Sequence, residues 1–141
     1  MKTLVIIPSR LSASRLPGKP LLKINGISII SHVFKRAEKA NIGEVIVAAE
    51  DQEIVDDIKR NGGNAILTSK NHKTGTDRIQ EAYKILDRNE SDFIMNIKGD
   101  APEIDIEDIR NLDNKMKINN SKIGTLAAKI SNSKIYNNEN V

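Results

Sequence analysis

A chain of 141 residues has the usual size of one globular domain, and it contains no cysteine, which excludes disulfides and thiolate metal sites. The 22 basic and 19 acidic residues leave a net charge of only +3, and aromatic residues make up 3% of the chain, so we expect no nucleic-acid partner. No apolar run approaches the roughly 18 residues of a membrane span and no signal-peptide pattern follows Met1, so we expect a cytoplasmic protein without a membrane partner.

Short apolar strands and amphipathic helices alternate along the chain. Strands are predicted at 3–8, 44–49, 64–67, 92–97 and 124–130. The first, second and fourth are almost continuously apolar, as strands buried on both faces of a parallel sheet must be. Between them, apolar residues at helical spacing predict four helices, with buried faces at 29–37, 54–58, 79–86 and 106–116.

The alternation predicts a three-layer α/β sandwich with a mostly parallel sheet. Asn61, Gly62 and Gly63 are expected to close the second helix, because these residues tolerate a left-handed backbone. In sheets of this class, ligands bind beyond the carboxyl ends of the strands, so the loops that follow the strands are where chemistry is expected.

Three cations, Arg10, Arg15 and Lys19, occupy the loop after the first predicted strand. The loop is not a phosphate cradle of the G-x-x-x-x-G-K-[ST] type, because Ala13 stands at its first glycine and Pro20 at its hydroxyl. The cations are expected to project into the predicted crevice and share phosphate oxygens, and the prolines are expected to keep the loop from forming a helix. A solvated basic loop is the alternative, and these residues alone leave both open.

A second candidate segment, "KGDAPE" at 98–103, follows the fourth predicted strand. Asp100 is a suitable ligand for Mg²⁺, which needs few protein ligands because phosphates and water complete its octahedron. Gly99 is expected to let the backbone come close to a ligand. A turn aspartate beside Pro102 explains the segment equally well.

A third segment, "HKTGTDRI" at 72–79, lies between the third predicted strand and the next helix. Thr76 or Asp77 is expected to cap that helix, while Gly75 and Arg78 can approach a base or ribose. Capping alone explains Thr76 and Asp77 adequately.

Together, and in this order, the three segments resemble the cytidylyltransferases that make CMP-3-deoxy-D-manno-octulosonate, the CMP-Kdo synthetases. The segment 10–20 is similar to the family's R-x-x-S-x-R-L-P-G-K-P loop, 24–26 to its I-N-G turn, and 72–78 to its H-x-[ST]-G-T-[DE]-R segment. Residues 98–102 match its Q-G-D-E-P segment in part. The resemblance runs along all 141 residues and implies a Rossmann-like nucleotidyltransferase fold, of which 1–141 is the nucleotide-binding N-terminal portion, truncated at the C-terminus.

The resemblance also implies an activity. It is the transfer of CMP from CTP to 3-deoxy-D-manno-octulosonate (Kdo) with release of pyrophosphate, for lipopolysaccharide synthesis, by a full-length protein that is a homodimer. By the same resemblance, the phosphates of CTP are held by Arg10, Arg15 and Lys19, Mg²⁺ is held by Asp100, and the nucleoside is surrounded by Ala48, Gly75, Thr76 and Arg78. The catalytic residues implied are Arg10, Lys19 and Asp100.

This chain departs from the family pattern near the implied metal site. Lys98 and Ala101 stand where the family has Gln and Glu, and Glu50 stands where it has the Asp of an A-T-D segment. We expect Lys98 to weaken metal-dependent chemistry, and the 141 residues alone to bind CTP weakly. Two alternatives follow. One is a cytidylyltransferase for another acidic sugar, which the 72–78 segment disfavours, and the other is a degenerate CTP-binding fragment without activity.

Overall fold

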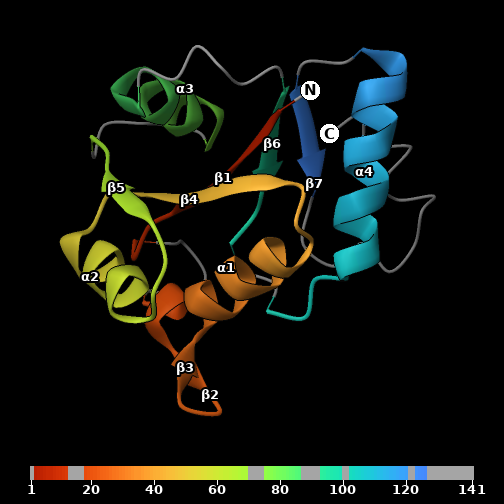
Figure 1. Ribbon diagram of the computed structural model, residues 1–141. Helices are drawn as coiled ribbons and strands as arrows, with labels where there is room; N and C mark the ends of the chain where they lie inside the picture. Colours follow the sequence, from red (N-terminus) through yellow and green to blue (C-terminus); the bar gives the residue numbers. More distant parts are fainter. Residues whose placement is uncertain are drawn as a thin grey trace.

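A parallel sheet occupies the centre of the protein (Figure 1). The computed structural model describes residues 2–12, 18–69, 75–86, 93–99, 102–120 and 123–126. Its main strands are β1 (Thr3–Ser9), β4 (Gly43–Ala49), β5 (Ala65–Leu67), β6 (Phe93–Ile97) and β7 (Ile123–Leu126). They lie in the order β5-β4-β1-β6-β7, and every neighbouring pair is parallel. The five predicted strands are therefore confirmed, with β5 beginning one residue later than predicted, and with 92 and 127–130 outside the described residues.

Helices cover both faces of this sheet. The four are α1 (Ile29–Lys39), α2 (Gln52–Arg60), α3 (Gly75–Leu86) and α4 (Ile106–Asn119), each at a position where a helix is predicted. Figure 1 shows α3 on the opposite side of the sheet from α1 and α2. The three-layer α/β sandwich is confirmed, and its central strand β1 ends between the two helical layers.

Alternating side chains of β1 separate two apolar cores. Val5 and Ile7 face the layer that contains α1, α2 and α4, whereas Leu4 and Ile6 face α3, and all four are 0–1% exposed. Because both faces are buried, the strand is apolar from Leu4 to Pro8, which is the reason that its sequence shows no alternation. The first core is the larger and includes the fully buried side chains of Ile30, Ile54, Phe93, Met95, Ile97 and Ile109.

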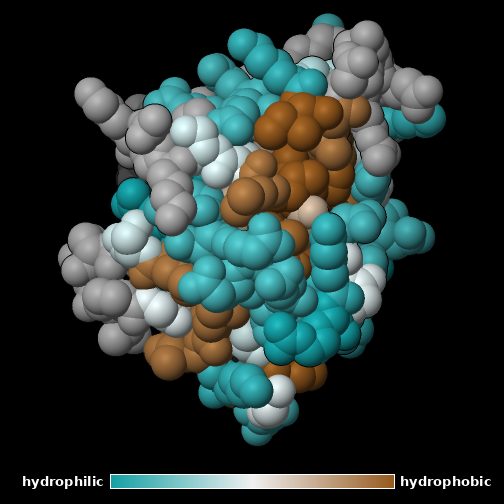
Figure 2. All heavy atoms as spheres, turned by 90° about the vertical axis from the view of Figure 1, so that its left-hand side faces the viewer, coloured by the Kyte–Doolittle hydropathy of each residue, from teal (hydrophilic) through white to brown (hydrophobic). Residues whose placement is uncertain are grey.

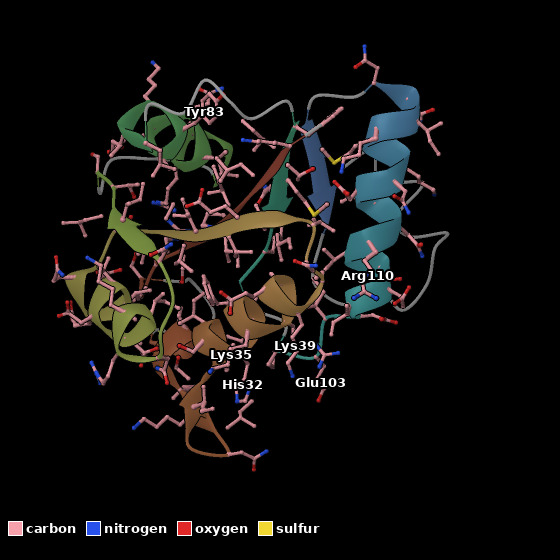
Figure 3. The ribbon with its side chains drawn as sticks, viewed as in Figure 1. His32, Lys35, Lys39, Tyr83, Glu103 and Arg110 are labelled. Atoms are coloured by element: carbon pink, nitrogen blue, oxygen red, sulfur yellow. The ribbon has the colours of Figure 1, made fainter. Side chains whose placement is uncertain are left out.

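Polar contacts fix how the helices in the larger layer meet. Ser28 caps α1 by accepting from the Ser31 backbone N–H, at 3.1 Å, and its hydroxyl donates to the Asp57 carboxylate of α2. Ser31 Oγ donates to the same carboxylate at 2.9 Å. At the C-terminal end of α1, Arg110 of α4 donates to the carbonyl oxygen of Ala40 at 3.2 Å (Figure 3). These bonds satisfy helix ends that packing would otherwise leave without partners.

Two short elements between β1 and α1 were not predicted. Residues Lys23–Ile24 (β2) and Ile27–Ser28 (β3) form an antiparallel hairpin, whose turn residues Asn25 and Gly26 have φ of 54° and 81°. Two consecutive positive φ values are typical of the tight turns that join hairpin strands. Before the hairpin, Lys19–Leu21 forms one turn of 3₁₀ helix.

This 3₁₀ turn corrects the expectation that the prolines exclude helix from the loop. Pro20 lies in the first turn, where its missing N–H has no helical acceptor to lose, so proline is compatible with a helix at this position.

The ends of α2 and α3 test two further expectations. Gly62 has a φ of 87° directly after α2, which confirms that this segment closes the helix with a left-handed residue. By contrast, α3 already begins at Gly75, so Thr76 and Asp77 lie in its first turn and the expectation that either caps the helix is wrong.

Within the described ranges, no helix is long and apolar enough to cross a membrane.

Large apolar side chains are exposed on β5 and on α3. Leu67 at the end of β5 is 49% exposed and Ile85 of α3 is 51% exposed. Figure 2 shows apolar surface on this side of the molecule. Both residues lie outside the polar contacts that form the site below.

Candidate active site

The cationic loop after β1 is closed at its base. The Gly18 backbone N–H donates to the Leu11 carbonyl oxygen at 2.8 Å, and the Leu11 N–H donates to Asp51 Oδ2 at 2.8 Å. Gly18 has a φ of 80°, a conformation that favours glycine, which explains the residue before Lys19. Exposed Arg10 and half-buried Lys19 are the sequence neighbours of Leu11 and Gly18, so the structure brings the backbones of two of the three predicted phosphate cations close together. The third, Arg15, lies outside the described residues.

A buried ion pair lies beside this loop. Arg78 Nη2 is 2.7 Å from Glu50 Oε2, and the two side chains are 4% and 8% exposed. Arg78 Nε also donates to Thr68 Oγ1 at 3.2 Å, and Ser12 Oγ donates to Glu50 Oε1 at 3.0 Å. The contact set thus joins the residues that follow β1, β4 and β5 to the first turns of α3.

Glu50 is a residue whose role sequence reasoning missed. It was noted only as a departure from a family pattern, yet its carboxylate has partners on two different segments. The available signal was its position: a charged residue directly after the buried strand β4, at the edge of the sheet where ligands are expected.

The residues predicted to surround the nucleoside have different environments in the structure. Arg78 points inward to Glu50 and Thr68, so these contacts occupy at least part of its guanidinium. Ala48 is 0% exposed and packs in the smaller core under α3, which gives its methyl group a packing role. Gly75 and Thr76 form the start of α3, and the side chain of Thr76 lies outside the described residues.

Gly99 is closely packed within the protein. A Cβ at this position would lie 2.7 Å from Ile30 Cδ1 and 3.2 Å from Ile7 Cγ2. This contact of the segment after β6 with α1 and β1 is a second reason for a glycine at this position, and the expectation that it lets the backbone approach a ligand stays a prediction. Its neighbour Lys98 is exposed, and Asp100 lies outside the described residues.

We expect Gly99→Ala to destabilise the protein by about 1–3 kcal/mol, because the new methyl group overpacks a close contact. Urea unfolding measures the change. Ile30→Val removes the Cδ1 atom that the methyl group meets, so the double variant Gly99→Ala/Ile30→Val should lose less stability than the two single variants added together. Strict additivity would show that the clash is not the cause.

A complete metal site is not formed by the described residues. They contain no group of three or more His, Asp or Glu side chains placed to hold an ion. The two carboxylates nearest the loop already accept hydrogen bonds, Glu50 from Ser12 and Arg78, and Asp51 from Leu11. The Mg²⁺ expectation rests on Asp100 and stays a prediction.

The comparison with known sequences decides the family. The sequence model described as cytidylyltransferase matches residues 4–141. The chain belongs to the cytidylyltransferase family.

Named members of this family are similar along almost the whole chain. The 3-deoxy-manno-octulosonate cytidylyltransferase of Nitrobacter winogradskyi is 43% identical over 99% of this chain, and that of Fusobacterium nucleatum is 45% identical over the same share. The chain spans 56% and 57% of their respective lengths.

Solved structures give the same fold. A CMP:2-keto-3-deoxy-manno-octonic acid synthetase complexed with CTP aligns with a TM-score of 0.79 and 38% identity, over 86% of this chain and 49% of that one. A cytidylyltransferase from Leptospira borgpetersenii aligns with a TM-score of 0.71 and 26% identity, over 86% of this chain and 51% of that one. The nucleotidyltransferase-like fold of this family member is thereby confirmed.

The similarity to the family's first loop is less complete than the segment 10–20 suggests. The pattern R-x-x-S-x-R places its serine at position 13, where this cytidylyltransferase has Ala13, with Ser12 and Ser14 on either side. Of these serines the structure describes Ser12, whose hydroxyl binds Glu50.

Proposed function

We propose that the intact protein containing this chain transfers CMP from CTP to Kdo and releases pyrophosphate. The observation that carries the proposal is the meeting of the loop flanked by Arg10 and Lys19 with the first turns of α3, through Glu50. The proposal is supported by the position of this contact, at the carboxyl edge of the sheet where ligands bind in such folds, and by 43% identity to a 3-deoxy-manno-octulosonate cytidylyltransferase.

The reaction needs alignment and charge neutralisation more than covalent chemistry by the enzyme. The anomeric hydroxyl of Kdo attacks the α-phosphorus of CTP, the new O–P bond forms, the bond to the β-phosphate oxygen breaks, and the hydroxyl proton leaves to solvent or a base. Arg10 and Lys19 hold the β- and γ-phosphates and neutralise the charge that grows on the leaving pyrophosphate. Mg²⁺ held by Asp100 would add to that neutralisation.

The substrate assignment predicts strong discrimination between nucleotides. Pyrophosphate release by the intact protein should be far faster with CTP than with ATP, GTP or UTP, and should require both Kdo and Mg²⁺. Phosphate contacts carry no information about the base, so discrimination must come from groups near the start of α3. A coupled pyrophosphate assay measures it.

The same assay contains its own controls. Omitting Kdo tests whether CTP is merely hydrolysed, and a sialic acid in place of Kdo tests the alternative acidic sugar. Equal pyrophosphate release from all four nucleotides would contradict the proposal. Release from CTP with the sialic acid but not with Kdo would show that the substrate is the other acidic sugar.

A further inference from the structure

The Glu50 carboxylate joins two segments that are proposed to hold different parts of one nucleotide. Its Oε1 accepts from Ser12 in the cationic loop at 3.0 Å, and its Oε2 accepts from Arg78 of α3 at 2.7 Å. We propose that Glu50 is a positioning residue that sets the cationic loop at a fixed distance from the start of α3, so that phosphates and nucleoside are bound together. This inference rests on the proposed CTP-dependent function.

The α3 side of this contact is rigid. Glu50 and Arg78 are almost fully buried, and the guanidinium is oriented further by Thr68, whose Oγ1 accepts from Arg78 Nε at 3.2 Å. Thr68 is itself held by the Ala49 carbonyl oxygen, which accepts the Thr68 N–H at 2.7 Å. A charge pair held in this way has little freedom to swing, so Glu50 presents its second oxygen in a constant direction.

The Ser12 side of the contact is open to solvent. Ser12 is exposed, so water competes for its hydroxyl, and Asp51 separately holds the loop base through the Leu11 N–H. Loss of the Ser12 hydroxyl should therefore leave the fold intact and change only how the loop is oriented.

The test separates binding from folding. In the intact protein, Ser12→Ala should raise the KM for CTP about 3- to 10-fold, the range for losing one hydrogen bond, with kcat and Tm nearly unchanged. Ser12→Thr keeps the hydroxyl and should restore the KM. Gln52→Ala removes a comparable exposed hydrogen bond, from Gln52 to Asp56 at 2.8 Å, and serves as the control with an unchanged KM.

A double variant shows whether Ser12 acts through Glu50. Glu50→Asp keeps a negative charge for Arg78 but withdraws from Ser12, so Ser12→Ala should add nothing to the KM in that background. An unchanged KM in Ser12→Ala, or an equal rise in both backgrounds, would overturn the inference. Failure of the proposed function is distinguishable, because the unsubstituted protein would then consume no CTP in the presence of Kdo.

Discussion

Lys19→Ala should lower kcat/KM of the intact protein by about two to three powers of ten. This is the loss expected when a preorganised positive charge beside a leaving group is removed. Lys19 directly follows Gly18, whose N–H closes the cationic loop onto Leu11, so the loop base fixes the backbone from which the lysine side chain extends. Steady-state kinetics with CTP and Kdo measure the effect.

Stability provides the control for this variant. The Lys19 backbone carbonyl oxygen accepts from the Leu22 N–H at 3.0 Å, and alanine keeps that bond, so Tm should barely change. Lys23→Ala, an exposed lysine four residues farther along on β2, should leave kcat/KM within about two-fold, the scale of a surface change away from a site. Normal turnover with a lowered Tm in Lys19→Ala would instead give the lysine a structural role.

The strands and helices were predictable because buried positions are apolar and recur at the period of the element that contains them. A strand such as β1, packed between two helical layers, is apolar along its middle on both faces, and α1 repeats apolar residues on the face that meets the sheet. The β2–β3 hairpin was missed because two-residue strands are too short to show any period. Its signal was the dipeptide Asn25-Gly26, which favours the positive φ values observed there.

The sequence predicts which segments form the candidate site better than it predicts the contacts of single residues. Loops after strands could be assigned to one edge of the sheet, and the loop flanked by Arg10 and Lys19 indeed lies beside the start of α3. The periodicity of apolar residues does not predict which charged side chains form ion pairs between distant segments. Arg78 and Glu50 are 28 residues apart, and their contact depends on β4, β5 and α3 all being in place. Gly99 shows the same limit, since its close contact is with Ile30, a side chain of α1 that is distant in sequence.

Breaking the Glu50–Arg78 pair from one side is expected to destabilise the protein strongly. Arg78→Met leaves the Glu50 carboxylate buried without its counter-charge, and Glu50→Gln leaves the Arg78 guanidinium in the same condition. Each should lower the free energy of unfolding by about 3–5 kcal/mol, because an uncompensated buried charge is poorly solvated. Urea unfolding at constant m-value measures the change.

Removing both charges together should be less harmful than removing either one alone. In Arg78→Met/Glu50→Gln no unpaired charge remains buried, and the glutamine oxygen still accepts from Ser12, so part of the lost stability should return. The exposed pair of Arg110 and Glu107, 46% and 66% exposed with Nη1 and Oε1 2.8 Å apart, provides the matched comparison. Glu107→Gln should change stability by less than about 1 kcal/mol, because water already solvates both groups.

A Glu50→Gln variant as stable as Glu107→Gln would show that burial does not make the inner pair different. Additive losses at Glu50 and Arg78 would show that the two charges are not coupled.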